Sequence, residues 1–314
     1  MMILGVDGGG SKTAARLAHV DSSGDISVVG EGMAGPSNVR AVGIESAIEN
    51  LETAIQAARA SHDSDTTLID VAILALAGSS RADVRDQVNS WAEGFSLAQR
   101  VDVIPDTEPV LALGMRESIG IALIVGTGSV ATGVGPSGSR VMIGGWGHWF
   151  GDHGSGYDLG RRALAAMANA VDEIGEKTVL VDAIVQHLGT DDPRDALGIL
   201  GRSTDMRREI ATLAPLLIKA AMDGDQVAEE ITLSAARASA RLVAAAADKL
   251  DLGKQFPLGI AGGIVCNSAY YRQHLLETLA GKAIQAMPLT IIDNPVEGAL
   301  LLARDEVVTK RQQP

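Results

Sequence analysis

Two glycine-rich loops hold the first residues of this sequence whose types and spacing could do chemistry. The first follows Asp7 and reads Gly-Gly-Gly-Ser-Lys-Thr over residues 8–13, and the second reads Gly-Thr-Gly-Ser over residues 126–129. Glycine lets a backbone approach an oxyanion closely, and successive N–H groups in such a turn form a concave anion site. We therefore predict phosphate contacts from Gly9, Gly10, Ser11, Lys12 and Thr13 in the first loop, and from Gly126, Thr127, Gly128 and Ser129 in the second.

Asp7 limits what the first loop can hold. A carboxylate there would repel a bare phosphate, so it predicts a divalent cation between the two, Mg²⁺ held through water. The loop is not a P-loop, because Ser11 stands where that motif needs Lys. It is not a dinucleotide fingerprint either, because a strand pattern follows it. A plain hairpin turn is the alternative, and the second loop at the matching point of the chain favours a ligand site.

Asp106 is the candidate general base. It comes just after the apolar run Val101–Ile104, at the carboxyl end of a predicted strand, which is where open α/β sheets place ligands. Phosphoryl transfer to a hydroxyl needs a carboxylate within hydrogen-bond reach of that hydroxyl. The alternative is that Asp106 caps the next helix, since Asp-Thr-Glu-Pro is a good helix start.

The elements that would position these residues form two similar α/β halves. In the first half, the patterns predict three strands and then alternating helices and strands, in the order βββαβαβα: strands Met2–Asp7, Ala14–Val20, Ile26–Gly30, Val71–Ala77 and Val101–Ile104, and helices Gly43–Ala60, Ala82–Ala92 and Pro109–Met115. The second half restarts this order and adds helices: strands Ile121–Gly126, Val130–Val134, Arg140–Ile143, Leu258–Ala261 and Met287–Ile292, and helices Ser155–Ile174, Val179–Leu188, Arg207–Met222, Gln226–Leu250, Ser268–Leu279 and Val296–Val308. We expect one domain over residues 1–117 and another over 118–295, with a ligand cleft between them and a helix at about 296–314 that packs back on the first.

Composition excludes several kinds of partner. The chain has 314 residues and a formal net charge of −13, so it offers no electrostatic footprint for nucleic acid or an anionic membrane. Ser118–Ser139 carries no formal charge but is interrupted by glycines and Pro136, which favours a buried hairpin over a membrane span. The start of the chain lacks the features of a signal peptide, so we expect a cytoplasmic protein. One cysteine, Cys266, excludes an internal disulfide and a self-contained iron–sulfur cluster.

Taken together, the motifs resemble those of a known superfamily. The two loops, with Ile-Ala-Gly-Gly at residues 260–263, resemble the phosphate-1, phosphate-2 and adenosine motifs of the actin/hexokinase/Hsp70 ATPases. Residues 144–155, Gly-Gly-Trp-Gly-His-Trp-Phe-Gly-Asp-His-Gly-Ser, resemble the signature of the N-acetylglucosamine kinase family, which is grouped with BadF/BadG-type ATPases. The resemblance implies two duplicated actin-like domains with a ribonuclease H-like fold. It also implies ATP as the phosphoryl donor, with adenine beside Gly262 and Gly263, where a strand-to-helix turn is the alternative.

The resemblance also implies an acceptor site. The residues that match hexose contacts of the family are Asn38, Asp106, Gly145, Trp146 and Asp152. Ser79 joins them as a replacement, because Ala77 stands where relatives can carry a hydroxyl. Trp146 could instead pack between the two expected domains, and Asp152 could cap the helix that starts at Ser155. A further departure is His153, which replaces the glutamate of the family signature and removes a negative charge beside Asp152.

These observations predict an ATP-dependent amino-sugar kinase that phosphorylates the 6-hydroxyl of N-acetylglucosamine. Glucosamine is the alternative acceptor, because no residue decides what surrounds C2 of the sugar. A redox-coupled activator of the BadF type is disfavoured, because its cluster needs paired cysteines from each subunit. A non-catalytic sugar or nucleotide sensor on the same fold is the remaining class, and a homodimer is an expectation from the family.

Overall fold

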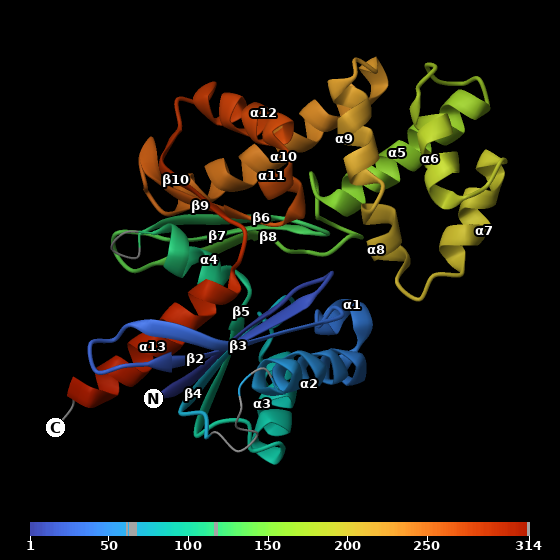
Figure 1. The fold of residues 1–314 in the computed structure, drawn as a ribbon. Helices are drawn as coiled ribbons and strands as arrows, with labels where there is room; N and C mark the ends of the chain where they lie inside the picture. The colour runs from blue at the N-terminus through green and yellow to red at the C-terminus, as the bar shows by residue number, and fades with distance from the viewer. Residues whose placement is uncertain (61, 63–67, 116–118, 313–314) are drawn as a thin grey trace. The chain divides into compact units, whose positions relative to one another are not determined.

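The computed structural model describes residues 1–60, 62, 68–115 and 119–312 (Figure 1). The chain divides into two compact units, Met1–Leu113 with Asn294–Pro314, and Gly114–Asp293. The predicted boundary at residues 117 and 118 lies outside the described residues. Each unit contains a five-stranded sheet with helices.

The sheet of the first unit has the strand order β3-β2-β1-β4-β5. The strands are β1 (Met2–Gly8), β2 (Thr13–Val20), β3 (Ile26–Ala34), β4 (Val71–Leu76) and β5 (Arg100–Pro105). The first three pair antiparallel, as tight turns allow, whereas β4 lies parallel to β1 and β5 lies parallel to β4. The helices are α1 (Val39–Val42), α2 (Ile44–Ala60), α3 (Ala82–Gly94), α4 (Thr107–Gly114) and α13 (Val296–Gln312).

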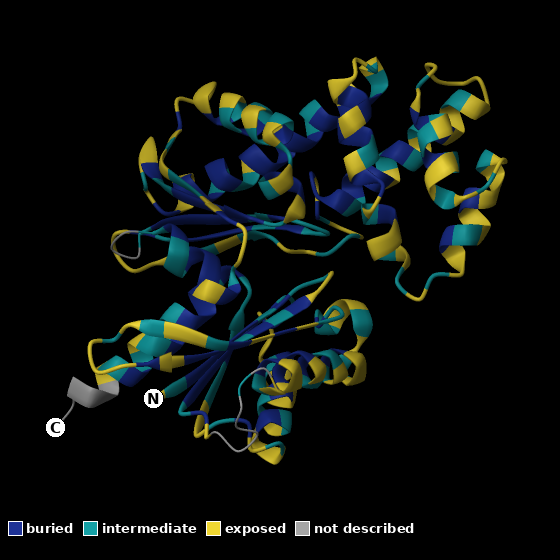
Figure 2. Ribbon diagram, viewed as in Figure 1, coloured by how far each residue is buried: buried dark blue, intermediate teal, exposed yellow. Residues whose placement is uncertain are grey.

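Both faces of this sheet are covered, which explains why β1 and β4 read as continuous apolar runs. Successive side chains of a strand point to opposite faces. Leu4 accordingly packs in the core on the α2 side with Leu51, whereas Ile3 packs with Leu300 of α13 on the other side. Figure 2 shows the central strands coloured largely as buried.

The second unit repeats the same plan. Its sheet has the order β10-β9-β6-β7-β8, with strands β6 (Gly120–Val125), β7 (Ser129–Val134), β8 (Arg140–Gly144), β9 (Gln255–Ala261) and β10 (Gln285–Ile292). The β6-β7-β8 strands pair antiparallel and β6, β9 and β10 pair parallel, as their counterparts do in the first unit. The predicted α/β class and duplicated strand order are therefore confirmed.

The helices of the second unit differ in detail from the predicted ones. They are α5 (Gly156–Val171), α6 (Leu180–Leu188), α7 (Ala196–Gly201), α8 (Met206–Ala211), α9 (Ala214–Met222), α10 (Gln226–Lys249), α11 (Gly263–Asn267) and α12 (Ala269–Ala280), with a 3-10 turn at Pro193–Asp195. The prediction of one helix over Arg207–Met222 was wrong. The chain breaks after α8 and restarts with Pro215 in the first turn of α9, where its missing N–H is tolerated.

Residues 120–134 of the uncharged stretch that could have been read as a membrane span form the β6-β7 hairpin instead. Over the described ranges, no helix has both the length and the apolar character needed to cross a bilayer.

Candidate active site

Asp7 and Asp106 lie at the same edge of the first unit's sheet. Asp7 is near the carboxyl end of β1, and Asp106 stands between the end of β5 and the start of α4. Burial, followed by the charge of Asp106, raises the pKa of Asp7 to about 7, and the Lys12 ammonium opposes this shift. Burial raises the pKa of Asp106 to about 6, against the lowering effect of its own backbone N–H and that of Thr107. The site therefore holds two carboxyl groups whose charged forms are both disfavoured.

The first glycine turn connects β1 to β2 beside these carboxyl groups. The Gly9 N–H closes the turn by donating to Lys12 O over 2.9 Å, and Gly9 O accepts the N–H groups of Ser37 and Asn38, each over 3.2 Å. A trans peptide directs its C=O and N–H to opposite sides. The N–H of Gly10, which shares the Gly9 carbonyl's peptide plane, therefore points away from Ser37 and Asn38.

Two predicted hydroxyl contacts are directed into the first unit. Thr13 is fully buried, and its hydroxyl lies 2.7 Å from Gly35 O and 2.8 Å from Ser37 Oγ. Ser79 is also fully buried and donates to Ile104 O over 2.8 Å. In this structure these two hydroxyls link segments that are distant in the sequence, and their predicted ligand contacts stay predictions.

Asn38 lies beside the end of β4. It is the N-cap of α1, and its side-chain Oδ1 accepts the N–H of Arg40 over 3.1 Å. A Cβ on Gly78 would lie 2.9 Å from Asn38 Oδ1 and 3.1 Å from Arg40 Cγ, so both side chains pass directly over Gly78. Gly78 follows β4, the strand between β1 and β5. Asn38 is thus at the edge of the sheet that also carries Asp7 and Asp106.

The second glycine turn, between β6 and β7, sits on the start of α5. Gly126 O accepts the N–H of Gly156 over 2.8 Å, and Thr127 O accepts the N–H of Tyr157 over 3.3 Å. The N–H groups of Thr127 and Gly128 share those two peptide planes and so point away from α5. This arrangement can present N–H groups to an anion.

Asp152 supports this turn from behind. Only 4% of it is exposed, and its Oδ1 accepts the N–H of Ser129 over 3.1 Å. Its Oδ2 accepts from Arg207 Nη2 over 3.0 Å. The alternative cap role was wrong, because Ser155 caps α5. The predicted hexose contact of Asp152 stays a prediction, and in the structure each of its carboxylate oxygens accepts a hydrogen bond within the second unit.

Arg207 is the site residue that sequence reasoning missed. It lies 55 residues after its partner, on α8. No local motif indicates such a pairing, because an isolated arginine in a helical pattern is ordinarily a surface residue.

Gly145 and Trp146 belong to a turn-rich segment after β8. The N–H of Gly145 donates to Ser129 O over 3.1 Å, which attaches the segment to the second turn. Trp146 is 71% exposed, and Trp149 and Phe150 are more than 80% exposed. This stretch thus presents three large aromatic side chains to solvent, in a chain with nine aromatic residues.

Gly262 and Gly263 begin the short helix α11 behind the second turn. A Cβ on Gly262, whose φ is +99°, would lie 2.6 Å from the carbonyl carbon of Val125. Backbone packing therefore explains Gly262 without a ligand. Gly263 has only the side chain of Asn267 nearby, with Nδ2 at 3.8 Å from where its Cβ would be.

The predicted residues fall into two sets. Asp7, the first turn, Asn38, Ser79 and Asp106 lie in the first unit, and the second turn, Gly145, Trp146, Asp152, Gly262 and Gly263 lie in the second. No group of three metal-ligating side chains occurs in the described part of the chain.

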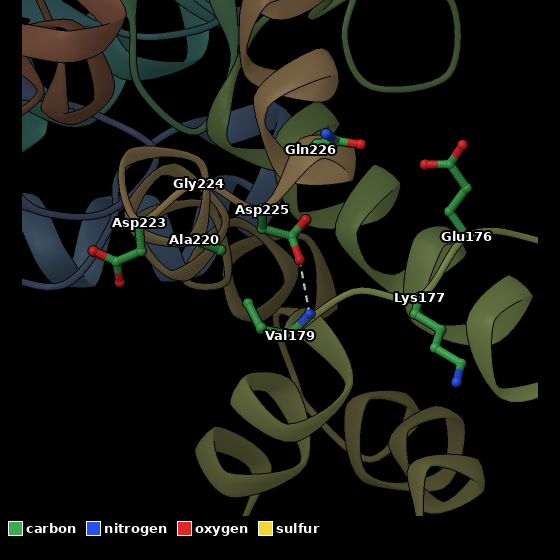
Figure 3. A pocket seen from close by; sticks show the side chains of 8 residues that line it. All are labelled: Glu176, Lys177, Val179, Ala220, Asp223, Gly224, Asp225 and Gln226. Carbon is green, nitrogen blue, oxygen red and sulfur yellow. Dashed lines mark hydrogen bonds between the residues drawn. The ribbon is translucent and has the colours of Figure 1, made fainter.

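A separate hollow of about 380 Å³ lies in the helical part of the second unit (Figure 3). It is lined by Glu176, Lys177, Val179, Ala220, Asp223, Gly224, Asp225 and Gln226. Asp225 has a structural role here, because its carboxylate accepts the N–H of Val179 over 2.8 Å and that of Ala228 over 2.9 Å. None of the predicted site residues lines this hollow.

Comparison with known proteins places these observations in a family. A sequence model of the BadF/BadG/BcrA/BcrD ATPase family matches residues 4–303. The chain is 30% identical over 305 residues to the N-acetylmuramic acid/N-acetylglucosamine kinase of Clostridium acetobutylicum, covering 97% of this chain and 98% of that protein. It is 28% identical to the N-acetyl-D-glucosamine kinase of Dictyostelium discoideum, with 96% and 97% covered.

The fold agrees with this relationship. A solved structure from Chromobacterium violaceum, described as that of a candidate N-acetylglucosamine kinase, superposes with a TM-score of 0.75 at 26% identity. The match covers 96% of this chain and 98% of that one.

Proposed function

This chain belongs to the BadF/BadG/BcrA/BcrD ATPase family, and from that premise we propose that it is an ATP-dependent kinase that phosphorylates the 6-hydroxyl of N-acetylglucosamine. The observation that carries the proposal is the pair Asp7 and Asp106 at one edge of the first sheet, with their pKa values raised to about 7 and about 6. A pair of buried carboxyl groups beside a glycine turn fits phosphoryl transfer, which needs both a base and a cation near the phosphates.

The two glycine turns would bind the phosphate groups of ATP. Each turn directs backbone N–H groups away from the segments whose N–H groups its carbonyls accept, as described for Gly10 and for Thr127 and Gly128. Backbone donors suit a chain whose net charge is −13, because they can bind a triphosphate without a cluster of basic side chains. Gly262 and Gly263 would lie beside the adenine.

Asp7 fits a magnesium site of the water-mediated kind. Mg²⁺ usually keeps several waters and binds through one or two carboxylates together with substrate phosphates, so a three-ligand protein site is not needed. Burial and the charge of Asp106 disfavour the ionised form of Asp7, and a bound cation would stabilise that form. Mg²⁺ held there would offset negative charge on the transferring phosphate.

Asp106 would act as the general base. A carboxylate with a pKa near 6 is a stronger base than an ordinary one and is still mostly ionised at neutral pH. It would accept the proton of the sugar 6-hydroxyl as that oxygen attacks the γ-phosphorus. Asn38, at the same edge of the sheet, would bind a sugar hydroxyl with its amide, and Gly145 and Trp146 would contribute from the second unit.

The choice of amino sugar is the finer part of the proposal. N-acetylmuramic acid carries an additional carboxylate, and Arg40, whose side chain passes over Gly78 together with that of Asn38, forms no ion pair within the described ranges. An acceptor with a carboxylate could pair with it. Glucosamine would instead need a carboxylate near C2. N-acetylglucosamine is our first choice, because both kinase relatives act on it by name.

A redox-coupled activator is the competing class. The sole cysteine, Cys266, is half-buried, and burial followed by the charge of Asp293 raises the pKa of its thiol to about 11. A thiol that resists ionisation is a poor cluster ligand. Purification without oxygen should therefore give colourless, iron-free protein, and stoichiometric iron would favour the activator instead.

The decisive experiment is a coupled ADP-release assay with ATP, Mg²⁺ and a panel of hexoses. The panel contains N-acetylglucosamine, glucosamine, N-acetylmuramic acid and glucose, and phosphorus NMR locates the phosphate on each product. We expect the highest kcat/KM for N-acetylglucosamine with phosphate on O6. If ATP and sugar bind but no amino sugar stimulates ADP release, the protein is a sensor and the kinase proposal is wrong.

A further inference from the structure

We propose that Arg207 is a positioning residue that neutralises Asp152 behind the Gly126–Ser129 turn and so makes this turn able to accept an anion. The identity of the anion as an ATP phosphate rests on the proposed function. The charge balance itself does not, because it concerns contacts within the second unit.

The contacts form a continuous chain from α8 to the turn. Arg207 Nη2 lies 3.0 Å from Asp152 Oδ2, and Asp152 Oδ1 lies 3.1 Å from the Ser129 N–H. The Ser129 hydroxyl donates to His153 O over 3.0 Å, which fixes the residue after Asp152 to the same turn. Asp152 has a φ of +56°, a conformation that non-glycine residues seldom adopt, so its placement is held by these contacts.

The ion pair lies directly against the turn. A Cβ on Gly128 would be 2.7 Å from Arg207 Nη2 and 2.9 Å from Asp152 Oδ1. Glycine at this position therefore lets the charged pair approach the backbone whose N–H groups would face the phosphate. The pair is also well shielded, since 18% of the Arg207 side chain and 4% of that of Asp152 are exposed.

Electrostatics explains why the turn needs the cation. Asp152 orients Ser129 but places a full negative charge immediately behind a site for another anion. Shielding from water strengthens that repulsion, because it lowers the effective dielectric constant. Arg207 cancels the charge and leaves the orienting hydrogen bond intact. Its Nε–H is buried with no hydrogen-bond acceptor in the described structure, so the guanidinium is held by its pair with Asp152 and not by a full set of acceptors.

The test compares four variants of the full-length protein by calorimetric titration with MgATP and MgADP. Arg207→Gln should weaken nucleotide binding about 10- to 100-fold, because an uncompensated charge remains behind the turn. Asp152→Asn should bind at least as tightly as the wild type. The double variant Asp152→Asn/Arg207→Gln should recover to within a few-fold of Asp152→Asn, and Arg207→Lys should stay near the wild type.

A purely structural role predicts a different pattern. In that case the double variant would bind as weakly as Arg207→Gln, and this result would overturn the proposal, as would unchanged binding by Arg207→Gln. Thermal unfolding of each variant identifies any that fails to fold, and Arg207→Lys keeps the comparison available if Arg207→Gln is unstable.

A second readout requires no nucleotide. The pKa of the His148 imidazole is lowered by burial and then by the charge of Arg207, whereas the charge of Asp152 raises it. His148 therefore reports on both members of the ion pair. An NMR titration should find the His148 pKa higher in Arg207→Gln and lower in Asp152→Asn, with His148→Gln used to assign the signal. An unmoved His148 pKa in both variants would overturn the proposed charge balance. A wild type that shows this balance but binds no ATP would count against the kinase proposal alone.

Discussion

The raised pKa values of Asp7 and Asp106 imply that both carboxyl groups lower the stability of the fold at neutral pH. A carboxyl group whose pKa is higher in the folded than in the unfolded chain takes up a proton on folding. Its contribution to stability is therefore greatest below the ordinary pKa of 3.8 and is lost as the pH rises through the folded value. Stability is often lower at functional sites for this reason.

Asp106→Asn tests whether Asp106 is the general base. The variant should bind MgATP like the wild type but lose about 10²–10⁴ in kcat, because the amide cannot accept the proton. In the wild type, kcat/KM for the acceptor should fall as the pH drops below about 6, where Asp106 becomes protonated. Asp102→Asn is the matched control, since Asp102 lies on β5, the strand that leads to Asp106, and pairs with Arg100. An unchanged kcat in Asp106→Asn would leave Asp106 with only the role of helix cap.

Asp7→Asn tests how much the buried carboxylate of Asp7 lowers the stability of the fold. Because the pKa of Asp7 is about 7 in the folded protein, the variant should unfold at a higher temperature than the wild type at pH 8. The gain should shrink as the pH falls from 7 to 4 and vanish below 4. Thermal unfolding without Mg²⁺ over this pH range measures the effect. A gain that grows toward acid pH would contradict the sign of the shift.

At the scale of elements, the pattern of apolar residues and the positions of turn residues predicted most of the fold. The strands that flank the two glycine turns were predicted within about two residues, because their apolar runs end at glycine. The break between α8 and α9 was missed, since the apolar pattern continues through it and only Pro215 marks the restart. The directions of the Thr13 and Ser79 hydroxyls could not be predicted, because their partners lie 22 and 25 residues away. The Arg207–Asp152 pair could not be predicted either, because these residues are 55 positions apart.

Gly262→Ala tests how tightly the start of α11 packs against the second turn. The added methyl would meet the Val125 carbonyl group at 2.6 Å in a backbone with φ of +99°, so we expect a loss of about 3 kcal/mol or more. Gly253→Ala is the control, because Gly253 has a φ of +69° and nothing within 4 Å. It should cost about 1 kcal/mol. Equal losses in urea unfolding would show that the close contact relaxes freely.

At the scale of the whole molecule, each unit has a core of its own. The core of the second unit is formed by its sheet and its added helices, and α13 completes the first unit's core from a distant part of the sequence. The sequence predicted this return of the helix to the first domain. The apolar face of this helix does not by itself indicate which sheet it covers.

Leu300→Ala tests this division. Leu300 is 2% exposed between α13 and the first sheet, and such truncations cost about 2–5 kcal/mol. Hydrogen exchange should rise in residues 1–113 and change little in 114–293. Leu217→Ala, in the buried core of the second unit, should give the reverse. Equal increases in both units for both variants would mean that the molecule opens as one cooperative body.

The return of α13 also orders events during synthesis. The second unit is continuous in sequence, so it can fold as soon as residue 293 has left the ribosome. The first unit begins earlier but must wait, with the α13 face of its sheet uncovered, until residues 296–312 emerge. The part of the protein that is translated first is therefore the part that matures last, and a chaperone would find its apolar surface on β1 and β4 throughout that interval.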